Sequence, residues 1–150
     1  MKKLGLCLLS AAFFAGVAAA QSAEKIADID ETEKVSYGQF CYLIATNSGT
    51  LSDGATYQEA FDAIRRTGVF YSNVLPNDPI PMSDVALLCS QTWNIQESLM
   101  YRLTKAPRYA FRQLQALDII PLTASPTSTS SGHQILNVIT LCIDFAGEGE

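Results

Sequence analysis

Residues 59–70 read EAFDAIRRTGVF and residues 109–120 read YAFRQLQALDII, so Phe61 and Phe111 hold the same place in two segments fifty positions apart. The shift of fifty continues without a gap into the next apolar stretch, where Val85 falls on Ile135. A register kept over about 35 positions indicates an internal repeat. In both segments the apolar residues recur at three- and four-residue steps, which is the period of an amphipathic helix. The sequence therefore predicts a repeated unit in which a short helix precedes a longer one.

Capping signals divide the chain into alternating long and short helices. A third copy of the long helix is expected upstream, because residues 35–40 match residues 80–85 at a shift of forty-five. Residues 97–104 are expected to add a helical turn before Pro107, which suits the first turn of the next helix. Three pairs fit the capping box that opens a helix, namely Ser36 with Gln39, Thr56 with Glu59, and Ser131 with Gln134.

These patterns predict an all-α fold, a small bundle of alternating short and long helices built on a repeat of about fifty residues. Each helix alone has an apolar face that it cannot bury, so the helices are expected to pack together. The expected core residues are Phe40, Leu43, Ile44, Phe61, Ile64, Val85, Leu88, Leu114, Leu117, Ile135, Val138 and Ile139.

The ends of the chain differ in composition from this helical part. Residues 1–20 combine two lysines, an apolar stretch and a final Ala-Ala-Ala, which is typical of a cleaved signal peptide. The apolar stretch is shorter than the roughly 20 residues that a membrane span needs. We interpret residues 21–34 as a flexible acidic spacer, 35–144 as the helical repeat domain and 145–150 as a disordered tail. The expected location is the bacterial periplasm or cell surface, with no membrane span after cleavage.

Charge and cysteine content narrow the function. The chain has 10 basic and 15 acidic residues, a net charge of −5, which argues against a general nucleic-acid binder. After the leader, an odd number of cysteines remains (Cys41, Cys89 and Cys142), which allows at most one internal bridge. Two interpretations stay open, one disulfide with a spare thiol or three small buried apolar side chains. No cysteine or histidine spacing resembles a zinc site, and we expect neither a metal nor another cofactor.

The order of a short helix, a Gly-apolar end, a loop with proline and a long helix resembles the S-layer homology repeat, in residues 60–93 and again in 110–143. The resemblance implies a scaffold that anchors proteins to cell-wall polymers or peptidoglycan. The family motif Ile-Thr-Arg-Ala-Glu stands here as Ile80-Pro81-Met82-Ser83-Asp84 and as Ser130-Ser131-Gly132-His133-Gln134. Both lack the arginine that supports anionic polymer binding in the family. The family's binding site is therefore not carried over to Met82, Gly132 or Tyr37.

One basic cluster is a candidate binding site. Arg102, Lys105, Arg108 and Arg112 recur at three- and four-residue steps, which align on one face of a continuous helix. Pro107 interrupts that helix. Such a patch suits phosphate or carboxylate groups of an anionic wall polymer, with the rings of Tyr101 and Tyr109 stacking on sugars. The competing interpretation is a solvated helix surface, which is the more common role of exposed charges. Trp93 follows the apolar stripe of its helix and is assigned to the core.

No catalytic residue is predicted. His133 and Cys142 are nine residues apart in one expected helix, which places them on opposite faces. The sequence holds no Gly-x-Ser-x-Gly turn and no Gly-rich phosphate loop. We therefore expect an exported, non-catalytic envelope protein that binds a cell-wall component or an envelope partner. The alternative is a periplasmic small-molecule binder or unrecognised hydrolase, which a pocket with convergent polar groups would favour.

Overall fold

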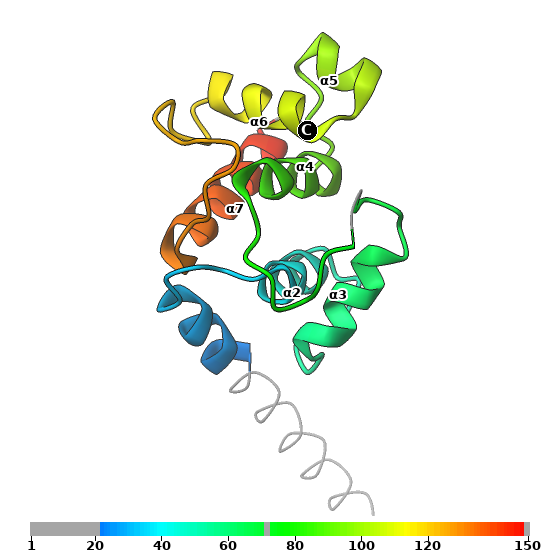
Figure 1. The fold of residues 1–150 in the computed structure, drawn as a ribbon, viewed down its shortest axis with the longest axis vertical. Coiled ribbons are helices and arrows are strands. Elements are labelled where there is room, and N and C mark those ends of the chain that lie inside the picture. The colour runs from blue at the N-terminus through cyan, green and yellow to red at the C-terminus, as the bar shows by residue number, and fades with distance from the viewer. Residues whose placement is uncertain (1–21, 71–72, 149–150) are drawn as a thin grey trace, which may run out of the picture.

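The computed structural model describes residues 22–70 and 73–148, so the predicted signal peptide over 1–20 lies outside the described residues. The described part is helical, and its β-structure is limited to two isolated bridges. This confirms the predicted all-α small bundle (Figure 1). A helix over 22–30 comes first. It is followed by α2 (Tyr37–Asn47), α3 (Tyr57–Arg65), α4 (Met82–Thr92), α5 (Leu99–Thr104), α6 (Pro107–Ala116) and α7 (Gly132–Gly147).

The helix starts agree with the capping signals. All three predicted capping boxes are formed, at the N-termini of α2, α3 and α7. Pro107 opens α6, and the turn before it bends at Lys105, whose φ of 52° ends α5. The predicted turn of helix before Pro107 is thus confirmed as α5. Because Pro107 separates α5 from α6, the basic cluster is divided between two helices.

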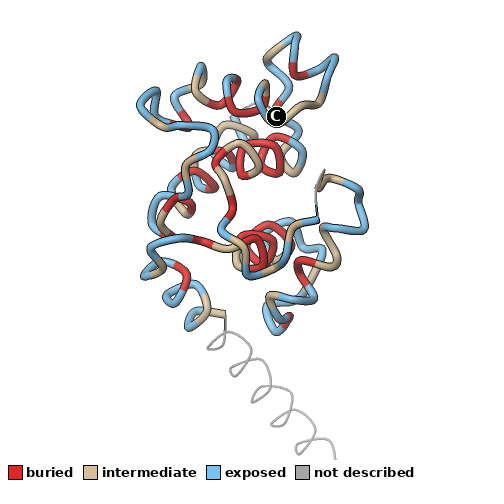
Figure 2. Tube along the Cα trace, in the orientation of Figure 1, coloured by how far each residue is buried: buried red, intermediate tan, exposed pale blue. Residues whose placement is uncertain are grey.

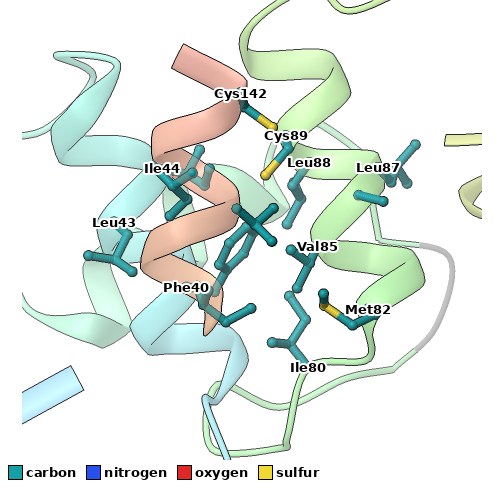
Figure 3. Packing of buried hydrophobic residues seen from close by; sticks show 14 of the residues in the cluster. Phe40, Leu43, Ile44, Ile80, Met82, Val85, Leu87, Leu88, Cys89 and Cys142 are labelled. Carbon is teal, nitrogen blue, oxygen red and sulfur yellow. The ribbon is translucent and has the colours of Figure 1, made fainter. Parts of the chain in front are cut away.

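The core lies where α2, α4, α6 and α7 pack together, with α3 lying against α2 (Figures 2 and 3). All of the predicted core residues contribute, although Ile64 and Leu117 are only half-buried at its edge. The cluster also takes in residues that helical periodicity had not singled out, among them Tyr42, Tyr101 and Ile120. Trp93 is half-buried and packs against the same cluster, in agreement with its assignment to the core.

Backbone hydrogen bonds join the segments that lead into the three long helices. The Val35 N–H donates to the Ser130 carbonyl (3.1 Å), and the Ile80 N–H donates to the Val35 carbonyl (3.0 Å). The Met82 N–H donates to the Ser128 carbonyl (2.9 Å). These bonds satisfy buried backbone groups and hold the starts of α2, α4 and α7 beside one another.

Equal spacing relates the later helices, because α3 and α6 begin fifty residues apart, as do α4 and α7. The connections between these helices differ. Only the second segment between a long and a short helix contains an additional helix, α5. The common origin of these units stays a prediction.

The prediction of a flexible spacer over 21–34 is wrong for the part that the structure describes. Residues 22–30 are helical, and Ile29 is fully buried in the core. The Lys25 ammonium donates to the Ala55 carbonyl (2.7 Å), and the Gly132 N–H donates to the Thr32 carbonyl (2.8 Å). This helix meets the start of α7, where Ile29 and Asp30 lie against Gly132 and His133 (Figure 1). The sequence of this helix is mostly polar and does not indicate that Ile29 is buried. Ile29 is buried because the helix packs against the start of α7.

The predicted disordered tail over 145–150 is also corrected. Helix α7 continues to Gly147, and Phe145 is half-buried against the core cluster. Residues 149–150 lie outside the described part of the chain. The helix continues through the acidic residues near this end, and Phe145 packs against the apolar core cluster.

Candidate functional site: a basic hollow beside α6

A surface hollow of about 790 Å³ lies between the start of α4, one side of α6 and the loop over 122–126. Its volume falls in the range of small-ligand sites, about 300–1,000 Å³. The residues that line it are Ser83, Asp84, Ala106, Pro107, Arg108, Phe111, Arg112, Gln115, Leu122, Ala124 and Pro126.

Helix α6 supplies one wall of the hollow. Arg108, Arg112 and Gln115 follow at four- and three-residue steps, which places them on one helix face. Phe111 is buried beside them and gives this wall an apolar base. The exposed side chain of Leu122 faces the same hollow from the loop. The site therefore combines two guanidinium groups with an apolar surface.

The opposite wall is held in place by hydrogen bonds. The Gln115 amide donates to the carbonyl of Pro121 (3.1 Å) and to that of Leu122 (3.4 Å). The Ser83 N–H, in the first turn of α4, donates to the Pro126 carbonyl (2.9 Å). The loop is thereby tied to both α6 and α4, so the shape of the hollow exists before any ligand arrives.

The hollow is lined by two positively charged side chains and one negatively charged side chain. Arg108 and Arg112 are exposed and make no ion pair within the described residues, where the single salt bridge joins His133 to Asp30 (3.3 Å). Asp84 lies at the edge of the hollow and accepts a hydrogen bond from the Tyr37 hydroxyl. Burial and the Asp84 carboxylate both raise the pKa of Tyr37, so its hydroxyl remains a proton donor that orients Asp84.

The chemistry of the lining residues suits two kinds of group. Guanidinium groups bind carboxylate and phosphate oxygens through paired, charge-assisted hydrogen bonds. Asp84 accepts hydrogen bonds from an ammonium or hydroxyl group. The hollow therefore suits a ligand that carries an anionic group, a nearby donor and an apolar part.

Only half of the predicted basic cluster reaches this site. Arg108 and Arg112 line the hollow, whereas Arg102 and Lys105 do not. The Lys105 ammonium donates to the Gln96 side-chain oxygen (3.0 Å) and lies 4.9 Å from the centre of the Tyr101 ring. The bend before Pro107 turns α5 away from the direction of α6, so the sequence spacing does not continue as a single face.

The two tyrosines predicted to stack on sugars are not on the hollow. Tyr101 is fully buried in the core, so its ring is not available to a ligand, and this prediction is corrected. Tyr109 is half-buried and packs against the core cluster. Both rings lie on the helix faces that turn inward.

Sequence reasoning missed Asp84 and the loop over 122–126. Asp84 lies in the first turn of α4, and only tertiary packing brings it to α6. Gln115 had a detectable signal, because it continues the four- and three-residue steps from Arg108 and Arg112. No local pattern in the sequence predicts that Leu122 lines this hollow.

The three described cysteines are buried free thiols, which corresponds to the second of the two predicted interpretations. Cys89 in α4 and Cys142 in α7 lie next to each other (Figure 3). Burial raises the pKa of Cys89 well above its ordinary value, and the contact with Cys142 raises it further. Burial alone raises the pKa of Cys41 to about 12. High pKa values keep the Cys41 and Cys89 thiols protonated and unreactive as nucleophiles.

The described residues bring together no group of three His, Cys, Asp or Glu side chains that could hold a metal ion. No helix in the described part of the chain has both the length and the apolar character to cross a membrane. Comparison of the chain with protein-family models, with curated proteins and with solved structures finds no match.

Proposed function

We propose that this protein is a non-catalytic binding module of the cell envelope that holds an anionic wall component, or an anionic partner, in the hollow beside α6. The observation that carries the proposal is the pair Arg108 and Arg112, one helical turn apart on a concave surface. Within the described residues neither arginine has an acidic partner. Charges beside apolar walls attract an anionic ligand more strongly than charges on a flat, fully hydrated surface.

Asp84 and the apolar wall narrow the ligand class. A purely anionic ligand would be repelled by the Asp84 carboxylate, whereas a ligand with both carboxylate and ammonium groups satisfies both signs of charge. The peptide stems of peptidoglycan carry both groups close together. Their methyl groups suit the surface formed by Phe111 and Leu122. A peptidoglycan stem peptide is therefore the ligand class that the hollow supports best.

A small-molecule binder is the second candidate, and the volume of the hollow favours it. A hydrolase has less support. The Ser83 hydroxyl is 3.5 Å from the Asp84 carboxylate, but the only histidine of the chain, His133, pairs with Asp30 at the start of α7. A serine nucleophile at this place lacks an imidazole base to accept its proton.

Retention on purified, insoluble peptidoglycan tests the proposal. We expect wild-type protein to be retained at low ionic strength and to be released as salt rises, because screening weakens exposed charge pairs. Arg108→Glu with Arg112→Glu should lower the retained fraction at least tenfold. Asp84→Asn should leave the fold intact and weaken retention less, since it removes one contact of three.

The matched control is Arg66→Glu with Arg102→Glu, which changes the net charge by the same amount at exposed arginines that do not line the hollow. This control should be retained like the wild type. Failure of the wild type to be retained would exclude the wall-binding function. Equal losses in both double variants would mean that overall charge, not the hollow, causes retention. Titration with soluble stem peptides then separates a polymer binder from a small-molecule binder.

A further inference from the structure

Helix α5 displays three large apolar side chains to solvent. Leu99, Met100 and Leu103 are 64%, 45% and 72% exposed. Leu103 follows Leu99 by four residues and Met100 by three, so it neighbours both on the same side of the helix. Five large apolar side chains within the described residues are at least 45% exposed, and three of them fall in this one helix. Figure 2 shows α5 as a projection that is mostly exposed, and Tyr101 is the buried residue of this helix.

The projection is firmly anchored. The buried side chain of Gln113 accepts a hydrogen bond from the Ser98 N–H (3.0 Å), just before α5 begins. The same amide donates to the Ile95 carbonyl (2.8 Å) and to the Ser90 hydroxyl (3.0 Å). Tyr101, on the inner face of α5, is fully buried. The exposed apolar face thus belongs to an ordered element whose other face is packed into the core.

Charge around α5 is opposite to that of the protein as a whole. Residues 97–112 contain four of the ten basic residues of the chain and one of its fifteen acidic residues. Arg102 is exposed within α5 itself. Leucine and methionine interleaved with basic residues are typical of helices that lie in the interface of a membrane. An acidic protein gains a local affinity for anionic head groups at such a segment.

We infer that α5 docks the protein onto an anionic lipid surface, with Leu99, Met100 and Leu103 entering the boundary between head groups and acyl chains and Arg102 contacting lipid phosphate. A protein partner fits less well, because a stable protein interface needs about 800 Å² on each side and this patch is formed by three side chains. Shallow insertion into a bilayer suits a patch of this size. The inference does not depend on the proposed function, since no α5 residue lines the hollow.

Co-sedimentation with lipid vesicles tests the docking. The chain should begin at Gln21, because the apolar stretch of residues 1–20 would itself enter membranes; all described contacts of the core lie within residues 22–148. We expect binding to vesicles that contain phosphatidylglycerol and much weaker binding to vesicles of phosphatidylcholine alone. Leu103→Ser should lower partitioning about tenfold or more. Arg102→Glu should lower it several-fold and only for the anionic vesicles.

Leu75→Ser is the matched control, because Leu75 is comparably exposed but belongs to the loop between α3 and α4. It should bind like the wild type, and circular dichroism should show the same helix content in all variants. No binding by the wild type, or equal binding to neutral vesicles, overturns the inference. A loss in Leu75→Ser equal to that in Leu103→Ser overturns it too, since the patch would then have no special role. Self-association that Leu103→Ser abolishes, without vesicle binding, reassigns α5 to a protein interface.

Discussion

Gly132 marks the closest approach between helix 22–30 and α7. A Cβ atom at this position would lie 1.6 Å from the Ile29 carbonyl oxygen and 2.8 Å from the Asp30 Cα. The obstructing atoms are backbone, so a side-chain rotation cannot relieve the overlap. The first helix can dock in its observed place only because residue 132 has no side chain.

Gly132→Ala should therefore lower the free energy of unfolding by about 2 kcal/mol or more, through displacement of helix 22–30 and exposure of Ile29. Urea denaturation followed by circular dichroism measures this change. Gly147→Ala is the control in the same helix, because nothing lies within 4 Å of its added Cβ. That control should change stability by less than about 1 kcal/mol. A Gly132→Ala protein as stable as the wild type would contradict the docked position of helix 22–30.

Gln113 shows how a polar residue becomes structural inside a core. Its side chain is buried, and its amide oxygen and nitrogen bond to groups from three places in the chain. A buried amide without partners would destabilise the fold, whereas this one is satisfied and connects α6 to the segment that carries α5. Residue type alone would have placed Gln113 at the surface.

At the scale of elements, α4 and α7 meet through Cys89 and Cys142 (Figure 3). Cys41 comes from α2, and none of the three is oxidised. The contact selects one of the three pairs that these three cysteines allow.

Refolding the chain from Gln21 onward, which leaves out Cys7, with oxidised glutathione should produce a bridge between Cys89 and Cys142. Thiol–disulfide exchange transfers the oxidation from glutathione, and two glutathione thiols are released for each protein bridge. Thiol labelling after denaturation should then find Cys41 alone, and the closed loop should stabilise the fold by about 4 kcal/mol in the chain-entropy account. Cys41→Ala should still form the bridge and Cys142→Ala should not. A mapped bridge that includes Cys41 would contradict the observed packing of α4 and α7.

The short elements illustrate what local sequence can predict. Capping boxes correctly placed the starts of α2, α3 and α7, because a cap depends on a side chain and a backbone group three residues apart. Pro107 correctly marked the break between α5 and α6 for an equally local reason. Helix 22–30 was missed because it has few apolar residues and is stabilised by contacts with distant segments.

At the scale of the whole molecule, the burial of a thiol and of a tyrosine hydroxyl should make the free energy of unfolding fall at alkaline pH. Cys41 and Tyr57 each have a pKa of about 12 in the folded protein, where burial is the largest cause of both shifts. The ordinary values are 9.0 for cysteine and 10.0 for tyrosine. Between these values and pH 12 the unfolded chain releases protons that the folded protein retains.

The free energy of unfolding should therefore be constant up to about pH 9 and fall as pH rises toward 12. Cys41 alone contributes about 4 kcal/mol to this fall, because each unit of pKa corresponds to about 1.4 kcal/mol. Urea denaturation at a series of pH values measures the slope. Cys41→Ala will be less stable at neutral pH but should show a shallower decline. A flat profile between pH 9 and 12 would contradict the burial of Cys41.

The candidate site was half predictable. Arg108 and Arg112 were singled out because helical spacing within a single element is visible in the sequence. Arg102 and Lys105 were grouped with them wrongly as part of the same face, and Tyr101 was assigned to a ligand although it is buried. Spacing gives the angle of a side chain around its own helix axis but does not say which face meets the core.

The sequence by itself determined the all-helical class, the starts of most helices and part of the core, because capping and apolar periodicity act between residues a few positions apart. Only the tertiary structure decided that residues 22–30 dock on α7, that Asp84 meets Arg108 and Arg112 at one hollow, and that α5 turns three apolar side chains outward. Those outcomes depend on contacts between segments far apart in the chain. No local sequence pattern predicts these contacts, because which face of a helix is buried depends on the distant element that packs against it.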